Sequence, residues 1–184
     1  MKQKALLATL LMLAACTDSG VRNIDYFKIG DFDTREDKSA VVAKLRAVEE
    51  VPNAVPSNFH YVNGEDKEGN EINVLFYDDK VVSFSIKLHY EIRTKTAQEL
   101  QAMEVKYEFD KLRRDSLGEC SIYTCVIADY NCDRSIIDDD KCSVVVHSAN
   151  NGDGWFTKIR WANQAFWKQQ TNDYLKSVGK ALPS

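Results

Sequence analysis

The sequence predicts an α+β fold in which helices pack on one face of a meandering antiparallel sheet. Three features support this: an alternating apolar and polar run at 82–92, two stretches of helical apolar spacing that each precede strand-like segments, and an Asn-Gly-Asp-Gly turn at 151–154. The expected order is a helix and three strands, the same again, and a closing helix. A chain of 184 residues is long enough to enclose the core of one domain.

The first helix is expected to begin at Thr34, which has an acidic residue three positions later and suits a capping role. Pro52 disfavours helical backbone at the residue before it and so ends the helix. Its apolar residues recur at helical spacing: Val41, Val42, Leu45 and Val48. Three strands follow, at 59–62, 72–76 and 82–92, with a polar loop at 63–70 and a tight turn at 77–80.

Residues 82–92 carry the clearest strand pattern in the chain. One side is apolar, with Val82, Phe84, Ile86, Leu88, Tyr90 and Ile92. The other side is polar, with Ser83, Ser85, Lys87, His89 and Glu91. Such alternation predicts a strand with one face in the core and one face in water.

The second half repeats this order of elements. A capping box at 96–99 begins a helix whose apolar stripe is Leu100, Met103, Tyr107 and Leu112, and Gly118 is the expected stop. Strands are predicted at 124–130, 142–149 and 155–161, followed by a helix at 163–178 with Phe166, Tyr174, Leu175 and Val178 near one face. This order resembles, in architecture alone, the small outer-membrane-assembly lipoproteins and the tandem-repeat β-lactamase inhibitors, although the glycine-containing turn of those families is not evident.

The N-terminus has the pattern of an export signal. Lys2 and Lys4 precede a short apolar run from Ala5 to Leu13, too short for a usual membrane-spanning helix. The residues Leu13-Ala14-Ala15-Cys16 that follow resemble the lipobox of bacterial lipoprotein precursors. This resemblance implies cleavage before Cys16, a diacylglycerol on its sulfur, and attachment to the membrane through N-terminal fatty acyl chains such as palmitate.

The domain organisation expected from this resemblance is a signal peptide at 1–15, a lipidated tether at 16–23 and a single periplasmic domain at 24–184. Thr17 stands where an aspartate would retain such proteins in the inner membrane, which favours the outer membrane. We therefore expect a lipid-anchored outer-membrane protein that faces the periplasm.

The charge of the chain excludes some partner classes. The formal net charge is −4, and removal of Lys2 and Lys4 with the signal peptide takes it to −6. Because an acidic chain is repelled by phosphate backbones and anionic headgroups, we expect no nucleic-acid partner.

The cysteines other than Cys16 are Cys120, Cys125, Cys132 and Cys142, and an even number in an exported chain predicts two disulfides. A strand between Cys125 and Cys132 spans about 23 Å, too far for a disulfide between these two. We favour pairs 120–125 and 132–142, with 120–132 and 125–142 as the alternative. The spacings lack the C-x-x-C pairs typical of zinc sites.

An acidic segment at 128–142 has partial similarity to a calcium-binding loop. Asp129, Asn131, Asp133, Ser135 and Asp140 fall at ligand positions of an EF-hand loop. However, Arg134 replaces the glycine of the sharp turn, and the last position lacks the longer glutamate. We favour a disulfide-clamped acidic hairpin tip, keep calcium as the alternative, and expect no cofactor.

No catalytic motif is recognised in the sequence, which contains no G-x-S-x-G, H-E-x-x-H or phosphate-binding glycine loop. The remaining candidate is the polar side of the sheet, where Lys87, His89, Phe156, Lys158 and Arg160 form a candidate binding face if their strands are neighbours. We expect a lipid-anchored envelope lipoprotein that is not an enzyme and binds a protein or envelope component. The alternative is an inhibitor or immunity protein against a hydrolase or toxin.

Overall fold

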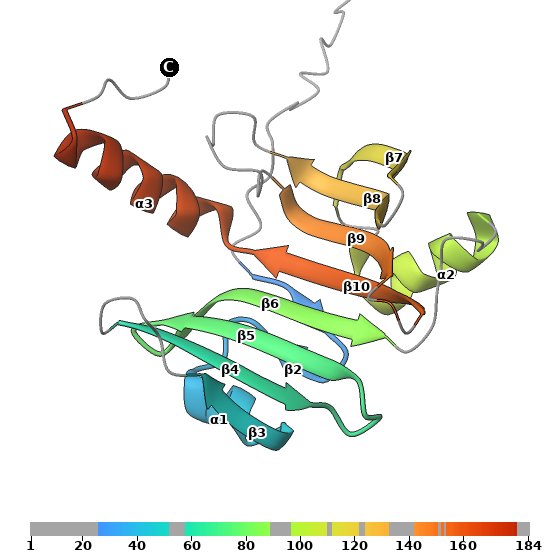
Figure 1. Cartoon of the computed structure of the whole chain (residues 1–184), viewed down its shortest axis with the longest axis horizontal. Coiled ribbons are helices and arrows are strands. Elements are labelled where there is room, and N and C mark those ends of the chain that lie inside the picture. Colours follow the sequence, from blue (N-terminus) through green and yellow to red (C-terminus); the bar gives the residue numbers. More distant parts are fainter. Residues whose placement is uncertain are drawn as a thin grey trace, which may run out of the picture.

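The computed structural model of the chain describes residues 26–51, 58–88, 97–109, 112–121, 124–132, 142–150, 152 and 154–179 (Figure 1). These residues form an eight-stranded sheet, a two-stranded sheet and three helices, and every strand pair is antiparallel. The predicted α+β class with an antiparallel sheet is confirmed. The predicted signal peptide and tether, including Cys16, lie outside the described residues.

The elements follow one another as β1 (Lys28–Ile29), β2 (Phe32–Asp33), α1 (Lys38–Val42), β3 (Arg46–Val51), β4 (Phe59–Glu65), β5 (Glu71–Tyr77), β6 (Lys80–Leu88), α2 (Ala97–Lys106), β7 (Arg114–Cys120), β8 (Thr124–Cys132), β9 (Cys142–Asn150), β10 (Trp155–Ala162) and α3 (Gln164–Ser177).

The large sheet consists of two four-stranded meanders. Its strand order is β3-β4-β5-β6-β10-β9-β8-β7, so the last strands of the two meanders, β6 and β10, pair with each other in the middle. The predicted order of three strands after each helix is therefore wrong by one strand in each half. The strands of this sheet that the sequence did not predict, β3 and β7, are its two edges, and the sequence did not predict the β1–β2 hairpin either.

The strand β3 lies where the sequence predicted helix. Helix α1 ends at Val42, and Ala47 has a φ of 48°, a left-handed conformation that a right-handed helix does not accommodate. Val48 is 44% exposed, because it belongs to the edge strand that pairs with β4 and not to a buried helical stripe. The N-cap is Asp37, whose carboxylate accepts from the backbone N–H of Ala40 at 2.9 Å, whereas Thr34 Oγ1 accepts from the N–H of Phe27.

The strand β7 replaces the end of the second predicted helix. Helix α2 ends at Lys106, and the chain turns through Tyr107 before β7 begins. Gly118, the predicted helix stop, lies inside β7 with a φ of 83°. Hydrogen bonds to β8 satisfy the backbone N–H and C=O groups of this segment. The spacing of apolar residues along the segment gives no sign of such a pairing.

Strand β4 also extends further than predicted, through the Asn63-Gly64 pair that was expected to begin a loop. A Cβ atom at Gly64 would lie 3.0 Å from the carbonyl oxygen of Arg46 and 3.1 Å from the Cβ of Leu45. The glycine therefore serves close packing against the chain that leads into β3, and not a turn.

Other local predictions are confirmed. Strands β9 and β10 pair as neighbours on either side of residues 151–154, where a turn was predicted, and α3 begins after Asn163, whose side chain accepts from the N–H of Phe166 at 3.0 Å. The tight turn before β6 is also present, with Asp78 and Asp79 at positive φ.

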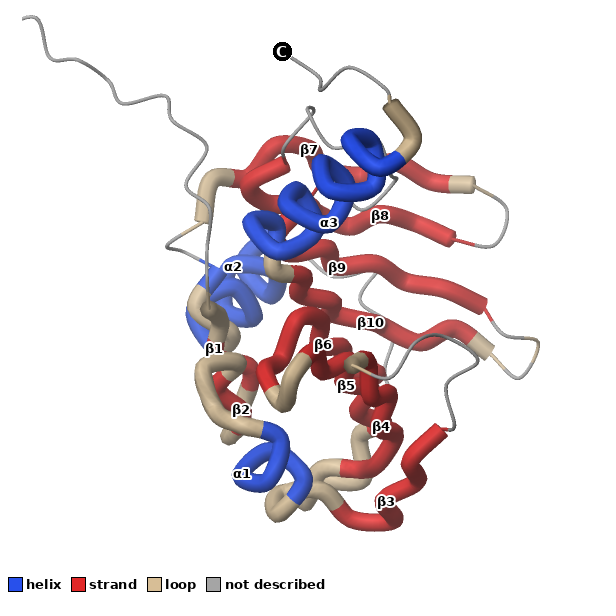
Figure 2. Tube along the Cα trace, turned by 90° about the vertical axis from the view of Figure 1, so that its left-hand side faces the viewer, coloured by secondary structure: helices blue, strands red, loops and turns tan. Residues whose placement is uncertain are grey.

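One face of the sheet carries the core. Figure 2 shows α1, α2 and the β1–β2 hairpin on the same side of the sheet. Fully buried side chains on this side come from both meanders and from the covering elements: Ile29, Val41, Val62, Ile72, Val74, Phe76, Val144, Val146, Ile159 and Trp161. The opposite side, which neither α1, α2 nor β1–β2 covers, is called the open face below.

Helix α3 departs from the prediction that the helices share one face. It extends from the end of β10 beyond the strand ends (Figure 1). Of the residues expected on one side of it, Leu175 is buried, but Tyr174 is 64% and Val178 46% exposed. The first turn contacts the ends of β4 and β5, where the ring of Phe166 lies 5.0 Å from that of Tyr77.

Candidate functional site

The open face brings together four residues that the sequence placed on its polar side. In the pairing of β6 with β10, Lys158 lies opposite Lys87 and Arg160 lies opposite Ser85. Phe156 precedes Lys158 on the same side of β10, because side chains two positions apart in a strand share a face. The condition that their strands are neighbours is therefore met for these four residues, whereas His89 lies outside the described residues.

The structure adds His147, which sequence reasoning did not select. The pairing of β9 with β10 places His147 opposite Lys158. Counting back from the 151–154 turn along both strands would have given this register. We call Lys87, Lys158, Arg160 and His147 the cationic strip, since three of the four are cations and all lie on adjacent strands.

The strip belongs to one row of directly opposed residues that crosses all eight strands of the large sheet. From β3 to β7 its positions are Arg46, Glu65, Glu71, Lys87, Lys158, His147, Val126 and Glu119. Neighbouring strands are about 4.8 Å apart, so the basic part of the row is about 10 Å wide. Acidic residues border it on the β5 and β4 side.

Lys87 already binds a carboxylate within this row. Its ammonium lies 3.1 Å from Glu71 Oε2 and 4.7 Å from the ring centroid of Phe156. Burial opposes ionisation of Glu71, but hydrogen bonds from Lys87 and Asn73 and nearby positive charge outweigh it, so the pKa of Glu71 is lowered. The pair thus shows how this face holds a carboxylate.

Lys158 is in a different position. It is half-buried, and among the described residues no carboxylate lies within ion-pair distance of its ammonium. Burial lowers the pKa of Lys158, the charge of Arg160 lowers it further, and the charge of Glu71 acts in the opposite sense. An ammonium that has lost part of its hydration and faces two other cations is destabilised.

His147 is neutral at pH 7 for the same reasons. Burial, and then the charges of Lys158 and Arg160, lower the pKa of His147 from 6.5 to about 4. A third cation beside the two basic side chains of β10 is thereby avoided. The neutral imidazole keeps hydrogen-bonding capacity for a ligand at this end of the strip.

Polar and aromatic groups continue the open face toward α3. Tyr61 donates its hydroxyl to Asn73 Oδ1 at 3.1 Å. Beyond them, the rings of Phe59, Tyr77, Phe166 and Trp167 pack together, with centroid distances between 4.9 and 6.5 Å. The face therefore combines a charged centre with an aromatic end, a composition common at protein interfaces.

One of the two favoured cysteine pairs, Cys132 and Cys142, is present at one end of the sheet. Cys132 and Cys142 are joined by a disulfide between β8 and β9, which excludes the alternative pairs 120–132 and 125–142. Cys125 is also disulfide-bonded, and Cys120 is its opposite residue in the β7–β8 register. The side chain of Cys120 lies outside the described residues, so its pairing stays a prediction.

The predicted acidic loop is described only at its beginning, since Asp133, Ser135 and Asp140 lie outside the described residues. Asp129 accepts from the N–H and the hydroxyl of Ser116, both at 2.6 Å. Asn131 Oδ1 accepts from the N–H of Arg113 at 3.3 Å. These oxygens serve the β7–β8 pairing, which is a structural role.

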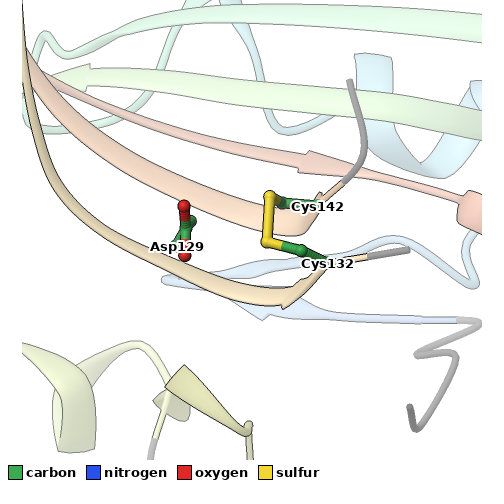
Figure 3. A group of neighbouring side chains, drawn as sticks. All are labelled: Asp129, Cys132 and Cys142. Atoms are coloured by element: carbon green, nitrogen blue, oxygen red, sulfur yellow. A yellow bond between two sulfur atoms is a disulfide. The ribbon is translucent and has the colours of Figure 1, made fainter. Parts of the chain in front are cut away.

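A possible metal-binding group also lies at this end. The ligand atoms of Asp129, Cys132 and Cys142 lie within 4.8 Å of one another (Figure 3). The thiolate is the form of cysteine that binds metals, and both sulfurs here belong to the disulfide. We therefore derive no metal site from this group.

A hollow of about 410 Å³ lies between the residues before α1 and the start of α3. Arg35 in its wall pairs with Asp33, and Glu36 pairs with Lys44. The half-buried charged residue of this wall, Glu36, is thus neutralised, unlike Lys158. The open face is the stronger candidate for a binding site.

Comparison of the chain with protein families, with curated proteins and with solved structures gives no match. Among the helices of the described residues, none has both the length and the apolar character required to cross a membrane.

Proposed function

We propose that this protein is a lipid-anchored envelope lipoprotein that binds another protein through the open face of its sheet and catalyses no reaction. The observation that carries the proposal is Lys158, a half-buried ammonium on the face that α1, α2 and the β1–β2 hairpin leave open, flanked by Lys87 and Arg160. Like charges in directly opposed positions reduce stability. A binding role gives a reason for this arrangement that folding does not.

The anchor and the location are part of the proposal. The lipobox at Leu13-Ala14-Ala15-Cys16 and the residue Thr17 support attachment to the outer membrane, facing the periplasm. The Cys132–Cys142 disulfide fits an oxidising compartment.

The test of the binding role is capture of partners by the mature protein with reversed charges on the open face. Lys158→Glu with Arg160→Glu is expected to reduce specific capture from envelope extracts at least tenfold, because two attractive charges become repulsive. Lys176→Glu on the exposed surface of α3 is the matched control and should capture as the unchanged protein does. Equal capture by the face variant and the control would refute the proposal, provided both melt as the unchanged protein does.

The partner's identity separates the two classes of function considered from the sequence. A protein of envelope assembly supports the binding module, whereas a hydrolase or toxin whose activity falls on binding supports the inhibitor or immunity role. In either case the same face variant must lose the interaction.

The anchor is tested by intact-mass measurement of the exported protein. We expect a chain that begins at Cys16 and carries two or three acyl chains, and an unprocessed precursor for Cys16→Ser. An unmodified mature chain that begins elsewhere would refute both the anchor and the proposed location.

A further inference from the structure

The cationic strip has one carboxylate-binding position filled from within the chain and one that no carboxylate of the described residues fills. Glu71 reaches Lys87 across β5 and β6. On the other side of Lys87, Lys158 occupies the next position of the same row, and no described carboxylate lies within ion-pair distance of it. The next positions of the row are His147, which is neutral and carries no charge that could balance Lys158, then Val126 on β8 and Glu119 on the β7 edge.

The chemistry of the missing group follows from these neighbours. An anion at Lys158 would also lie near Arg160, two positions along β10, and near His147, directly opposite on β9. One negative charge there would attract the half-buried ammonium of Lys158 and offset the repulsion from its basic neighbours. A carboxylate is the group that this same row already binds, at Lys87.

The surroundings of the strip limit the shape of the anionic partner. Glu71 and Glu65 are exposed on one side of the strip, and Asp129 lies in the adjacent row on β8, opposite Val145. The basic region is about 10 Å wide. A broad anionic surface, such as a phospholipid bilayer or a nucleic acid, would meet these acids as well, whereas a narrow segment would not.

We propose that the cationic strip receives a carboxylate side chain carried on a narrow projecting segment of an acidic protein partner, with Lys158 as its main contact. This inference rests on the proposed function, because it names what the open face recognises. Phe156 and the other half-buried groups beside the strip exclude water around the contact and strengthen it.

His147 provides a direct reporter of this event, since it faces Lys158 across the strand pair. A carboxylate bound between them offsets the positive charges that now disfavour the imidazolium, and an opposite charge within about 4–6 Å raises the pKa of an imidazole by about one pH unit or more. The probe is hexa-aspartate added to the mature protein in detergent micelles. The measurement is the pH titration of the ring resonances of His147, assigned with His147→Gln.

We expect hexa-aspartate to raise the titration midpoint of His147 by about one pH unit. Phosphate at equal ionic strength and phosphatidylglycerol vesicles should raise it by less than half as much. Lys158→Gln should abolish the rise, while Lys158→Arg, which keeps the charge, and Lys176→Gln, on α3, should retain it.

Three outcomes would overturn the inference: an unchanged midpoint, an equal effect of phosphate or vesicles, or a rise that persists in Lys158→Gln. The two proposals fail separately. If capture of partners depends on the open face but hexa-aspartate leaves His147 unchanged, the binding role stands and carboxylate recognition falls. If the face variants capture partners as well as the unchanged protein does, the binding role is refuted, whatever the effect of hexa-aspartate on His147.

Discussion

The two meanders of the sheet have the same topology but are stabilised by different means. In β3–β6, the inner side is formed by large apolar residues such as Ile72, Val74 and Phe84, and this meander contains no cysteine. In β7–β10, the inner row that begins at Leu88 continues through Thr157, Ser148 and Cys125, so apolar volume is lost toward the β7 edge.

The second meander also buries polar atoms at a cost. Within the described part of the chain, Ser143 Oγ, Ser148 Oγ and Trp161 Nε1 are buried without a hydrogen-bond partner. Each buried polar group of this kind typically costs about 1–3 kcal/mol.

Two kinds of specific contact offset this cost. The Cys132–Cys142 disulfide joins β8 to β9. Glu104 of α2 accepts from the hydroxyl of Tyr130 at 2.5 Å and also pairs with Arg114 of β7, so that α2 is fixed to the sheet. One arrangement of strands can thus be stabilised by packing in one half and by cross-links and polar contacts in the other, and the second half supplies most of the cationic strip.

The largest expected effect is the loss of packing in the first meander. Phe84 is 1% exposed, lies opposite Val74 and Trp161, and its ring centroid is 5.1 Å from that of Phe32. Phe84→Ala should reduce the free energy of unfolding by about 3–5 kcal/mol, measured by urea denaturation. Leu117→Ala, at an exposed position of β7, is the control and should change it by less than about 0.5 kcal/mol. Similar effects of the two substitutions would contradict the dependence of this half on packing.

The next effect is the loss of the disulfide in the second meander. The pair closes a loop of ten residues, and the chain-entropy model gives such a closure a little under about 3 kcal/mol. Cys132→Ser with Cys142→Ser should lower the melting temperature by about 5–10 °C. Amide hydrogen exchange should accelerate in β8 and β9 and stay unchanged in β4 and β5.

Addition of calcium tests whether the loop between β8 and β9 is a metal site and not only a disulfide-clamped loop. We expect millimolar calcium to leave the melting temperature of the oxidised protein unchanged. If the loop were a calcium site, calcium at one hundred times the dissociation constant would add about 2.7 kcal/mol to the free energy of unfolding. A calcium-dependent rise that Asp129→Ala abolishes would therefore establish the metal-binding alternative.

The smallest expected effect is the pH dependence conferred by His147. Its folded pKa, about 4, lies below the ordinary 6.5, so the unfolded chain binds more protons as the pH falls. Stability present above pH 6.5 is therefore lost progressively between pH 6.5 and 4, by about 1 kcal/mol at pH 5 once solvent screening is included. The lowered pKa values of Asp31, Asp33, Asp37, Glu50 and Glu71 act only below their ordinary values of 3.8 to 4.5.

The measurement is the free energy of unfolding between pH 7 and 5. His147→Gln should flatten the curve over this interval, because glutamine does not titrate there. A curve that keeps its slope in the variant would mean that other groups cause it.

The sequence by itself determined the features that depend on neighbouring residues. The alternation in β6, the 151–154 turn, the cap of α3 at Asn163 and the Cys132–Cys142 pair were all predicted, because periodicity, turn chemistry and short chain separation are local properties. The same alternation placed Lys158 and Arg160 on the polar side of β10.

Tertiary structure alone decided the features that depend on pairing between distant segments. The edge strands β3 and β7 were not predicted, because their sequences have helical spacing or none and they become strands by hydrogen bonding to β4 and β8. The pairing of β6 with β10 brought Lys87 beside Lys158, and the strip became a unit only when this register joined the two meanders. Backbone hydrogen bonds between strands carry no side-chain signature, so the charge of the open face emerged from the fold and not from any single segment.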